Sequence, residues 1–83
     1  MDYIFSKHAK EQMKRRNIEE TEIQETLKNP EQIIKQETYY IYQSIMTKKN
    51  KKYLLRVFIN VDEKPVKIIT CYKTTKIDKY YES

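Results

Sequence analysis

The spacing of apolar residues along the chain changes once, near residue 32. Before that point, apolar residues recur every three or four positions, as at Phe5, Ala9 and Met13, which is the spacing of one helix face. After that point, β-branched and aromatic residues follow the two-residue period of strands. The pattern predicts an α+β domain in which two N-terminal helices pack on one antiparallel β-sheet of three to four strands.

Both helices carry end signals. Ser6 is suited to cap the first helix, which we expect to end at about Arg16, where Asn17 can take the left-handed conformation. Glutamates from Glu19 onward favour the start of a second helix, and Asn29-Pro30 ends it. Two short helices should therefore precede the sheet.

The strand pattern is punctuated by turn residues. We expect turns at 47–52 and 62–65 and strands at 32–37, 39–47, 52–62 and 66–74. The first two strands can also be interpreted as one bent strand. The segment 76–81 is interpreted either as a short helix or as a tail.

Alternation assigns each strand residue to a face of the sheet. In the strand 52–62, one side is continuously apolar and should pack under the helices: Leu55, Val57, Ile59 and Val61. In the last strand we expect Ile69 and Cys71 on that helix side, and Ile68, Thr70 and Tyr72 on the opposite side. Arg56, Thr70 and Tyr72 then share one sheet face, whereas a slip of one residue would separate them.

The charge is uneven along the 83 residues, which we interpret as one domain (1–83). Residues 1–47 hold seven basic and eight acidic side chains, whereas residues 48–83 hold ten basic and four acidic ones. Within the second half, Lys48, Lys49, Lys51 and Lys52 gather at one predicted turn. The second half is therefore the part expected to face a polyanion, unless these lysines only solvate the turn.

Composition excludes several classes of function. Glycine is absent, so no Walker loop or dinucleotide-binding loop is present. No Cys/His cluster has metal-ligand spacing, and Cys71 is the single cysteine. With no signal peptide and no membrane-spanning run, we expect a cytoplasmic protein that uses neither a metal nor another cofactor.

Short motifs occur in a characteristic order along nearly the whole chain: Ser6-Lys-His-Ala9, Asn29-Pro30, Leu55-Arg-Val57 and Thr70-Cys-Tyr-Lys-Thr74. In this order and spacing the chain resembles the small BrnT-like toxins of the RelE/ParE superfamily, and specifically an uncharacterised domain family placed beside them. The resemblance implies a ribonuclease toxin (mRNA interferase) of a type II toxin–antitoxin pair, neutralised by a small antitoxin protein.

Members of that superfamily cut RNA without a metal, through attack of the ribose 2′-hydroxyl on the adjacent phosphate. The resemblance implies mRNA, on or off the ribosome, as the substrate. Carried over to this chain, it implies catalytic roles for His8, Arg56, Tyr72 and Lys73. Some members inhibit gyrase instead, so gyrase inhibition and a non-catalytic nucleic-acid or protein-binding module remain as alternatives.

The residue types agree with this chemistry, because cleavage needs a base, cationic stabilisation of the phosphorane and a proton donor. His8 is a candidate base or a helix-start residue bonded to backbone. Arg56, one of only three arginines, is expected to bind phosphate in an exposed cleft beside His8. The alternatives are an ion pair with Glu37 or another acid on a neighbouring strand, or a contact to the antitoxin. Tyr72 either donates a proton, stacks on a base or fills the sheet. Lys73 should point to the side opposite Tyr72 unless it lies at the strand end.

Further basic residues are candidates for RNA binding. Arg15 and Arg16 either contact RNA or finish the first helix. Lys48, Lys49, Lys51 and Lys52 are candidates for phosphate contacts. Tyr39, Tyr40 and Tyr42 form a stacking platform or, as we prefer, pack beside the core.

Overall fold

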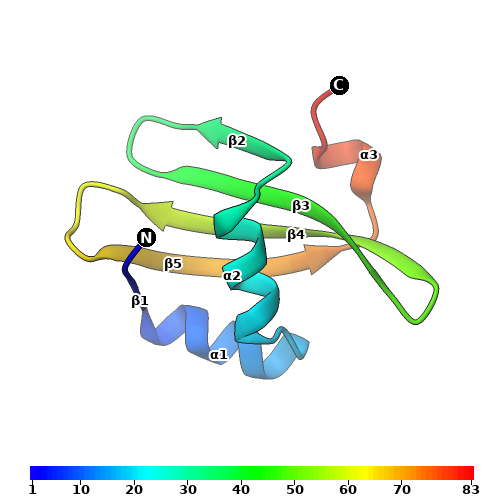
Figure 1. Ribbon diagram of the computed structural model, residues 1–83, viewed down its shortest axis with the longest axis horizontal. Helices are drawn as coiled ribbons and strands as arrows, with labels where there is room; N and C mark the ends of the chain where they lie inside the picture. The colour runs from blue at the N-terminus through cyan, green and yellow to red at the C-terminus, as the bar shows by residue number, and fades with distance from the viewer.

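The computed structural model describes residues 1–83 and contains five strands and three helices (Figure 1). In chain order these are β1 (Tyr3–Phe5), α1 (Lys7–Arg16), α2 (Glu20–Lys28), β2 (Gln32–Lys35), β3 (Tyr40–Lys48), β4 (Lys51–Asn60), β5 (Val66–Thr74) and α3 (Ile77–Tyr80). The α+β class predicted from the sequence is confirmed.

The ends of α1 and α2 follow from local chemistry. The Ser6 side chain accepts from the Ala9 backbone N–H, and Asn17 ends α1 in the left-handed conformation at φ 54°. Glu19 and Glu22 form a reciprocal capping box at the start of α2. Both caps use side chains within one turn of the helix end, which is why the sequence could predict them.

The sheet has the order β1-β5-β4-β3-β2 and is mixed, because β1 runs parallel to β5 while all other pairs are antiparallel. The prediction of a purely antiparallel sheet of three to four strands is therefore wrong. The sequence missed β1, since three residues are too few to show a period. The segments 32–37 and 39–47 are two strands, not one bent strand, because β2 pairs with β3.

The main core lies between the sheet and the two longer helices. Ala9 of α1 and Ile23 of α2 are fully buried in one cluster with Leu55, Val57 and Ile59 of β4. Tyr40 and Tyr42 pack against this cluster as predicted, whereas Tyr39 does not and lies against Phe58 instead. The predicted apolar face of β4 is thus the face covered by the helices. Figure 1 shows α2 crossing in front of the sheet and α1 lying along the β5 side.

A β-bulge changes the predicted facing of two residues in β5. Val57 pairs with Cys71 and Phe58 with Thr70, but Ile59 pairs with Ile68, so Ile69 is the extra residue. Ile68 is consequently fully buried in the core, and Ile69 is 37% exposed. The prediction had these two residues the other way round. Cys71 was placed correctly, because it lies beyond the bulge.

The opposite sheet face is covered in part by the C-terminal segment (residues 76–83), which contains α3. Gln43 donates to the Tyr80 backbone carbonyl at 3.2 Å, and Tyr81 donates to the Glu31 carboxylate at 3.0 Å. On this face Leu54 is fully buried and Arg56 is 8% exposed. Of the two interpretations of residues 76–81, the short helix is the one observed.

Candidate nucleic-acid interface

A pocket of about 650 Å³ opens beside the β3–β4 hairpin, and we call it the basic pocket. Five lysines and one arginine contribute to its wall, together with four uncharged residues. Its lining is Arg16, Asn17, Lys48, Lys49, Lys51, Lys52, Tyr53, Lys73, Thr74 and Thr75. Lining of this kind suits a polyanion such as a phosphodiester chain.

Three distant parts of the chain build the basic pocket. The hairpin supplies lysines on both sides of its two-residue turn, where Lys49 and Asn50 both have positive φ. The end of α1 supplies Arg16, and the end of β5 supplies Lys73. The two strands meet here because Leu55 pairs with Lys73. The pocket is therefore a tertiary feature and not a property of the lysine-rich turn alone.

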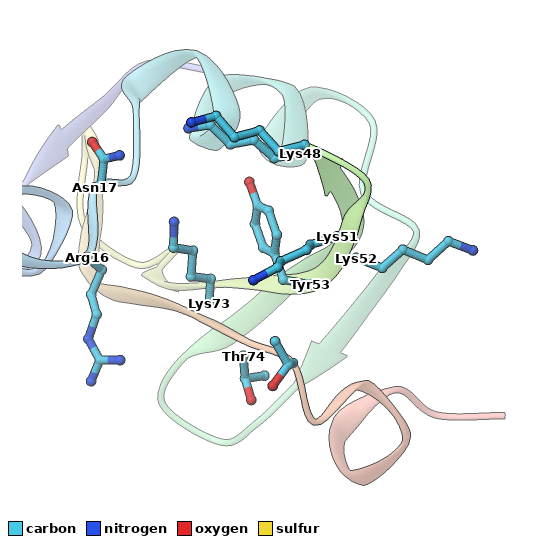
Figure 2. A pocket seen from close by; sticks show the side chains of 10 residues that line it. Arg16, Asn17, Lys48, Lys51, Lys52, Tyr53, Lys73 and Thr74 are labelled. Carbon is cyan, nitrogen blue, oxygen red and sulfur yellow. The ribbon is translucent and has the colours of Figure 1, made fainter.

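The side chains differ in where they point. Figure 2 shows the ammonium groups of Lys51 and Lys73 and the hydroxyl of Tyr53 directed into the central space. The side chains of Lys52 and Arg16 extend away from it, at the rim. The inner groups are thus placed to contact one bound phosphate, while the rim groups can contact its neighbours along a chain.

One carboxylate lies against the pocket. Tyr53 donates to Glu22 Oε1 at 2.6 Å, and the same oxygen is 4.0 Å from Lys48 Nζ. Burial, and then the hydrogen bond to Glu22, raises the pKa of the Tyr53 phenol above its ordinary value. Tyr53 therefore stays protonated at neutral pH. Lys73 Nζ lies 5.2 Å from the centre of the Tyr53 ring, a cation–π distance.

The structure brings together most of the residues predicted to bind RNA. Arg16 and the four hairpin lysines line the basic pocket with Lys73, which had been expected to point away from Tyr72 and does so. Arg15 is exposed on α1 but does not line the pocket. The sequence offered no signal for Tyr53, because it was one tyrosine among eight.

Arg56 and Tyr72 form a separate arrangement on the opposite sheet face. They are paired across β4 and β5, as the predicted register required, and Arg56 Nη1 donates to the Tyr72 hydroxyl at 2.7 Å. Arg56 Nε also donates to Gln43 Oε1 at 2.8 Å. The alternative pairing of Arg56 with Glu37 is not observed, because the one ion pair of the structure joins Lys48 to Glu22.

His8 does not lie beside Arg56, so the expectation of a shared exposed cleft is wrong. His8 is exposed on α1, next to Ala9, which is buried on the helix-covered face of the sheet. The Arg56 side chain lies on the opposite face of the sheet, because its neighbours Leu55 and Val57 are in the helix-side core. The Arg56 side chain is also 8% exposed rather than open to solvent.

No three residues among His, Cys, Asp and Glu come close enough together to hold a metal ion. None of the three helices, of which α1 is the longest with ten residues, has the length and apolar character needed to cross a bilayer.

Comparison with known proteins places the chain in a family. No curated protein and no solved structure matches the chain. Residues 5–73, most of the chain, match the family described as "Domain of unknown function (DUF4258)". The matched range includes α1, the β3–β4 hairpin and Lys73, and therefore nearly the whole basic pocket. The chain belongs to this DUF4258 family of domains.

Proposed function

We propose that the domain binds RNA and that the basic pocket holds phosphates of the RNA backbone. The observation that carries this proposal is the gathering of six cationic side chains around one pocket whose lining contains no carboxylate. Lysine and arginine contacts to phosphates supply most of the sequence-independent affinity for nucleic acids. Asn17, Thr74 and Thr75 add side chains that hydrogen-bond phosphates or ribose hydroxyls.

A matched pair of double variants tests this proposal. Lys51→Gln with Lys73→Gln removes two charges that point into the pocket. Lys10→Gln with Lys64→Gln removes two charges from exposed positions outside it. Binding of a fluorescent single-stranded RNA is measured by anisotropy across a series of salt concentrations. We expect the pocket variant to bind more weakly and to lower the salt slope by about 1.4, at about 0.7 for each lost phosphate contact.

The control variant should keep the slope of the unchanged protein. Equal losses in both variants would show that only net charge matters, and the pocket would lose its role. Tighter binding to DNA of the same sequence would assign the pocket to DNA.

The second candidate function is the metal-independent ribonuclease toxin implied by the resemblance to BrnT-like toxins. The supporting observation is that Lys51, Lys73 and the protonated Tyr53 hydroxyl point into one space. Cationic groups there would stabilise the phosphorane, and one of their ammonium groups would donate a proton to the leaving oxygen. The Glu22 carboxylate beside Tyr53 is the nearest candidate base.

In this reaction the 2′-oxygen bonds to phosphorus and loses its proton to the base. The bond from phosphorus to the 5′-oxygen breaks, and that oxygen takes a proton from the donor. The products are a 2′,3′-cyclic phosphate and a 5′-hydroxyl. Purified protein incubated with RNA in EDTA should produce these ends, and Lys73→Gln should abolish them while His8→Ala, outside the pocket, should not.

If the RNA stays intact but binds in a salt-sensitive way, the ribonuclease proposal fails and the RNA-binding proposal stands. DNA damage on expression with RNA untouched would favour the gyrase-inhibiting alternative. The toxin proposal also requires a cognate antitoxin protein, so expression of this chain alone should arrest growth and co-expression of a small neighbouring reading frame should restore it.

A further inference from the structure

The guanidinium of Arg56 is enclosed by aromatic rings and not by acids. Its carbon lies 4.5 Å from the centre of the Tyr80 ring, 5.4 Å from that of Phe58 and 5.7 Å from that of Tyr72. The side chain is 8% exposed and pairs with no carboxylate. Of its five N–H donors, two have acceptors, Gln43 and Tyr72. The site therefore holds a cation whose charge no acid balances.

A row of rings continues from this cation across the sheet. The Tyr72 ring stacks on that of Phe58 with centroids 5.9 Å apart, and Phe58 is followed by Tyr39 at 5.7 Å. The planes within these pairs are inclined by 28° and 32°. All three rings keep partial exposure. Such a row on an open sheet face is the kind of surface on which unpaired bases stack.

The ring over Arg56 belongs to the C-terminal segment. Tyr80 comes from α3, a helix of four residues with none buried. The segment is attached mainly through polar contacts, which join Gln43 to the Tyr80 carbonyl, Gln32 to the backbone of Glu82 and Tyr81 to the Glu31 carboxylate. Its one aromatic ring-to-ring contact is T-shaped, between Tyr80 and Tyr72. A short element with few buried apolar contacts opens at low free-energy cost. The segment also lies beyond residue 73, where the family match ends.

Tyr80 occupies the place that a nucleobase takes when it stacks on an arginine plane. Gln43 lies beside it and supplies an amide that can bond a base edge. Tyr72 and Lys73 are consecutive in β5 with opposite facing, so this site and the basic pocket lie on opposite faces of the same end of the sheet.

We propose that Arg56 and the row of Tyr72, Phe58 and Tyr39 form a second RNA site, which takes an unpaired base. In the free protein, Tyr80 fills this site, and the C-terminal segment acts as an intramolecular competitor of single-stranded RNA. This inference rests on the proposed RNA binding for the identity of the ligand. It adds a base-stacking contact and an autoinhibitory contact to the phosphate contacts of the basic pocket.

The test removes the competing ring in the full chain. Tyr80→Ala should raise the affinity for a short oligouridylate by at least about fivefold, the lower end of the contribution of one stacked base. Tyr80→Phe keeps the ring, and the Tyr80 hydroxyl makes no hydrogen bond, so this control should bind like the unchanged protein. Double-stranded RNA, whose bases are already stacked, should show no gain with Tyr80→Ala.

The gain in RNA affinity must depend on the Arg56 site that the Tyr80 ring vacates. Adding Arg56→Lys, or Phe58→Leu if that variant unfolds, to Tyr80→Ala should remove the gain, because each takes away a planar stacking surface. Thermal unfolding, measured for every variant, checks that each variant is folded under the conditions of the binding measurement. No gain with Tyr80→Ala, or a gain that survives both second substitutions, would overturn the proposal.

These outcomes are separate from those of the basic pocket. Loss of binding in the Lys51 and Lys73 variant together with no gain in Tyr80→Ala would retain the phosphate site and reject the stacking site. A gain in Tyr80→Ala with no effect of the two lysines would do the reverse.

Discussion

The hydroxyl of Tyr53 on β4 donates to the carboxylate of Glu22 on α2 at 2.6 Å, and this contact joins the sheet to the helix at the wall of the basic pocket. The Tyr53 side chain is itself buried. A charged phenolate in this place would lose the hydrogen bond and face a carboxylate of the same sign. The bond thus both fastens α2 and fixes the protonation state of the one aromatic ring in the pocket.

This contact predicts a loss of stability at alkaline pH. The pKa of Tyr53 is higher in the folded protein than the ordinary value of about 10, so its contribution is complete below about pH 10 and is lost as the pH rises above that value. Urea unfolding at about pH 8 and about pH 11 measures this loss. Tyr53→Phe should show a smaller decrease than the unchanged protein, and equal decreases would contradict the raised pKa.

The turn of the β3–β4 hairpin predicts opposite effects of one substitution on stability and on binding. Lys49 has φ 52°, a left-handed conformation that costs a residue with a Cβ about 1 kcal/mol and that glycine takes freely. Lys49→Gly should therefore raise the free energy of unfolding by up to about 1 kcal/mol. It should also weaken RNA binding, because Lys49 lines the basic pocket.

Lys52→Gln is the matched control for that prediction, because it removes a pocket charge from a β4 position that does not have positive φ. It should weaken binding without stabilising the fold. Chemical unfolding and anisotropy measured on the same samples separate the two effects. A destabilised Lys49→Gly variant would contradict the strain assigned to the turn.

The features that the sequence predicted are those set by neighbouring residues. Ser6 and Asn17 act within one helical turn of the ends they cap, and the alternation in β4 places Val57 and Arg56 on opposite faces. What it missed depends on distant partners. Strand β1 forms by parallel pairing with β5, which is distant in sequence. Likewise, nothing near Arg56 in the sequence indicates that the Tyr80 ring covers the Arg56 guanidinium.

The candidate site likewise combines features that neighbouring residues predict with features that depend on distant residues. The lysines of the hairpin tip were evident as a local cluster, but their partners Arg16 and Lys73 come from two other elements. His8 and Arg56 had the residue types that RNA cleavage requires, yet residue type does not determine position in space. The facing of α1 and β4 decides the position, and it places them on different sides of the sheet.

The β-bulge at Ile69 predicts different costs for the same change at adjacent residues. Ile68 is fully buried, so Ile68→Val should cost about 1 kcal/mol for the methylene group and the space it leaves. Ile69 is 37% exposed, so Ile69→Val should stay within about 0.5 kcal/mol. Urea unfolding of the two variants measures the difference. A larger cost at Ile69 would show that β5 lacks the bulge and has the simple alternation predicted from the sequence.

The reactivity of the Cys71 thiol tests whether the helix-side core is closed to solvent. Burial raises the pKa of Cys71 to about 11, and its side chain is fully enclosed in the core cluster. Since the thiolate is the reactive form, the folded protein should hardly react with a thiol reagent near neutral pH, whereas the protein in urea should react fully. Raising the pH to about 9 should accelerate the reaction of a free cysteine with the reagent, whereas the reaction of Cys71 in the folded protein should stay slow. Labelling followed by mass spectrometry measures this, and a fast reaction of the folded protein at neutral pH would show that the core under α1 is open.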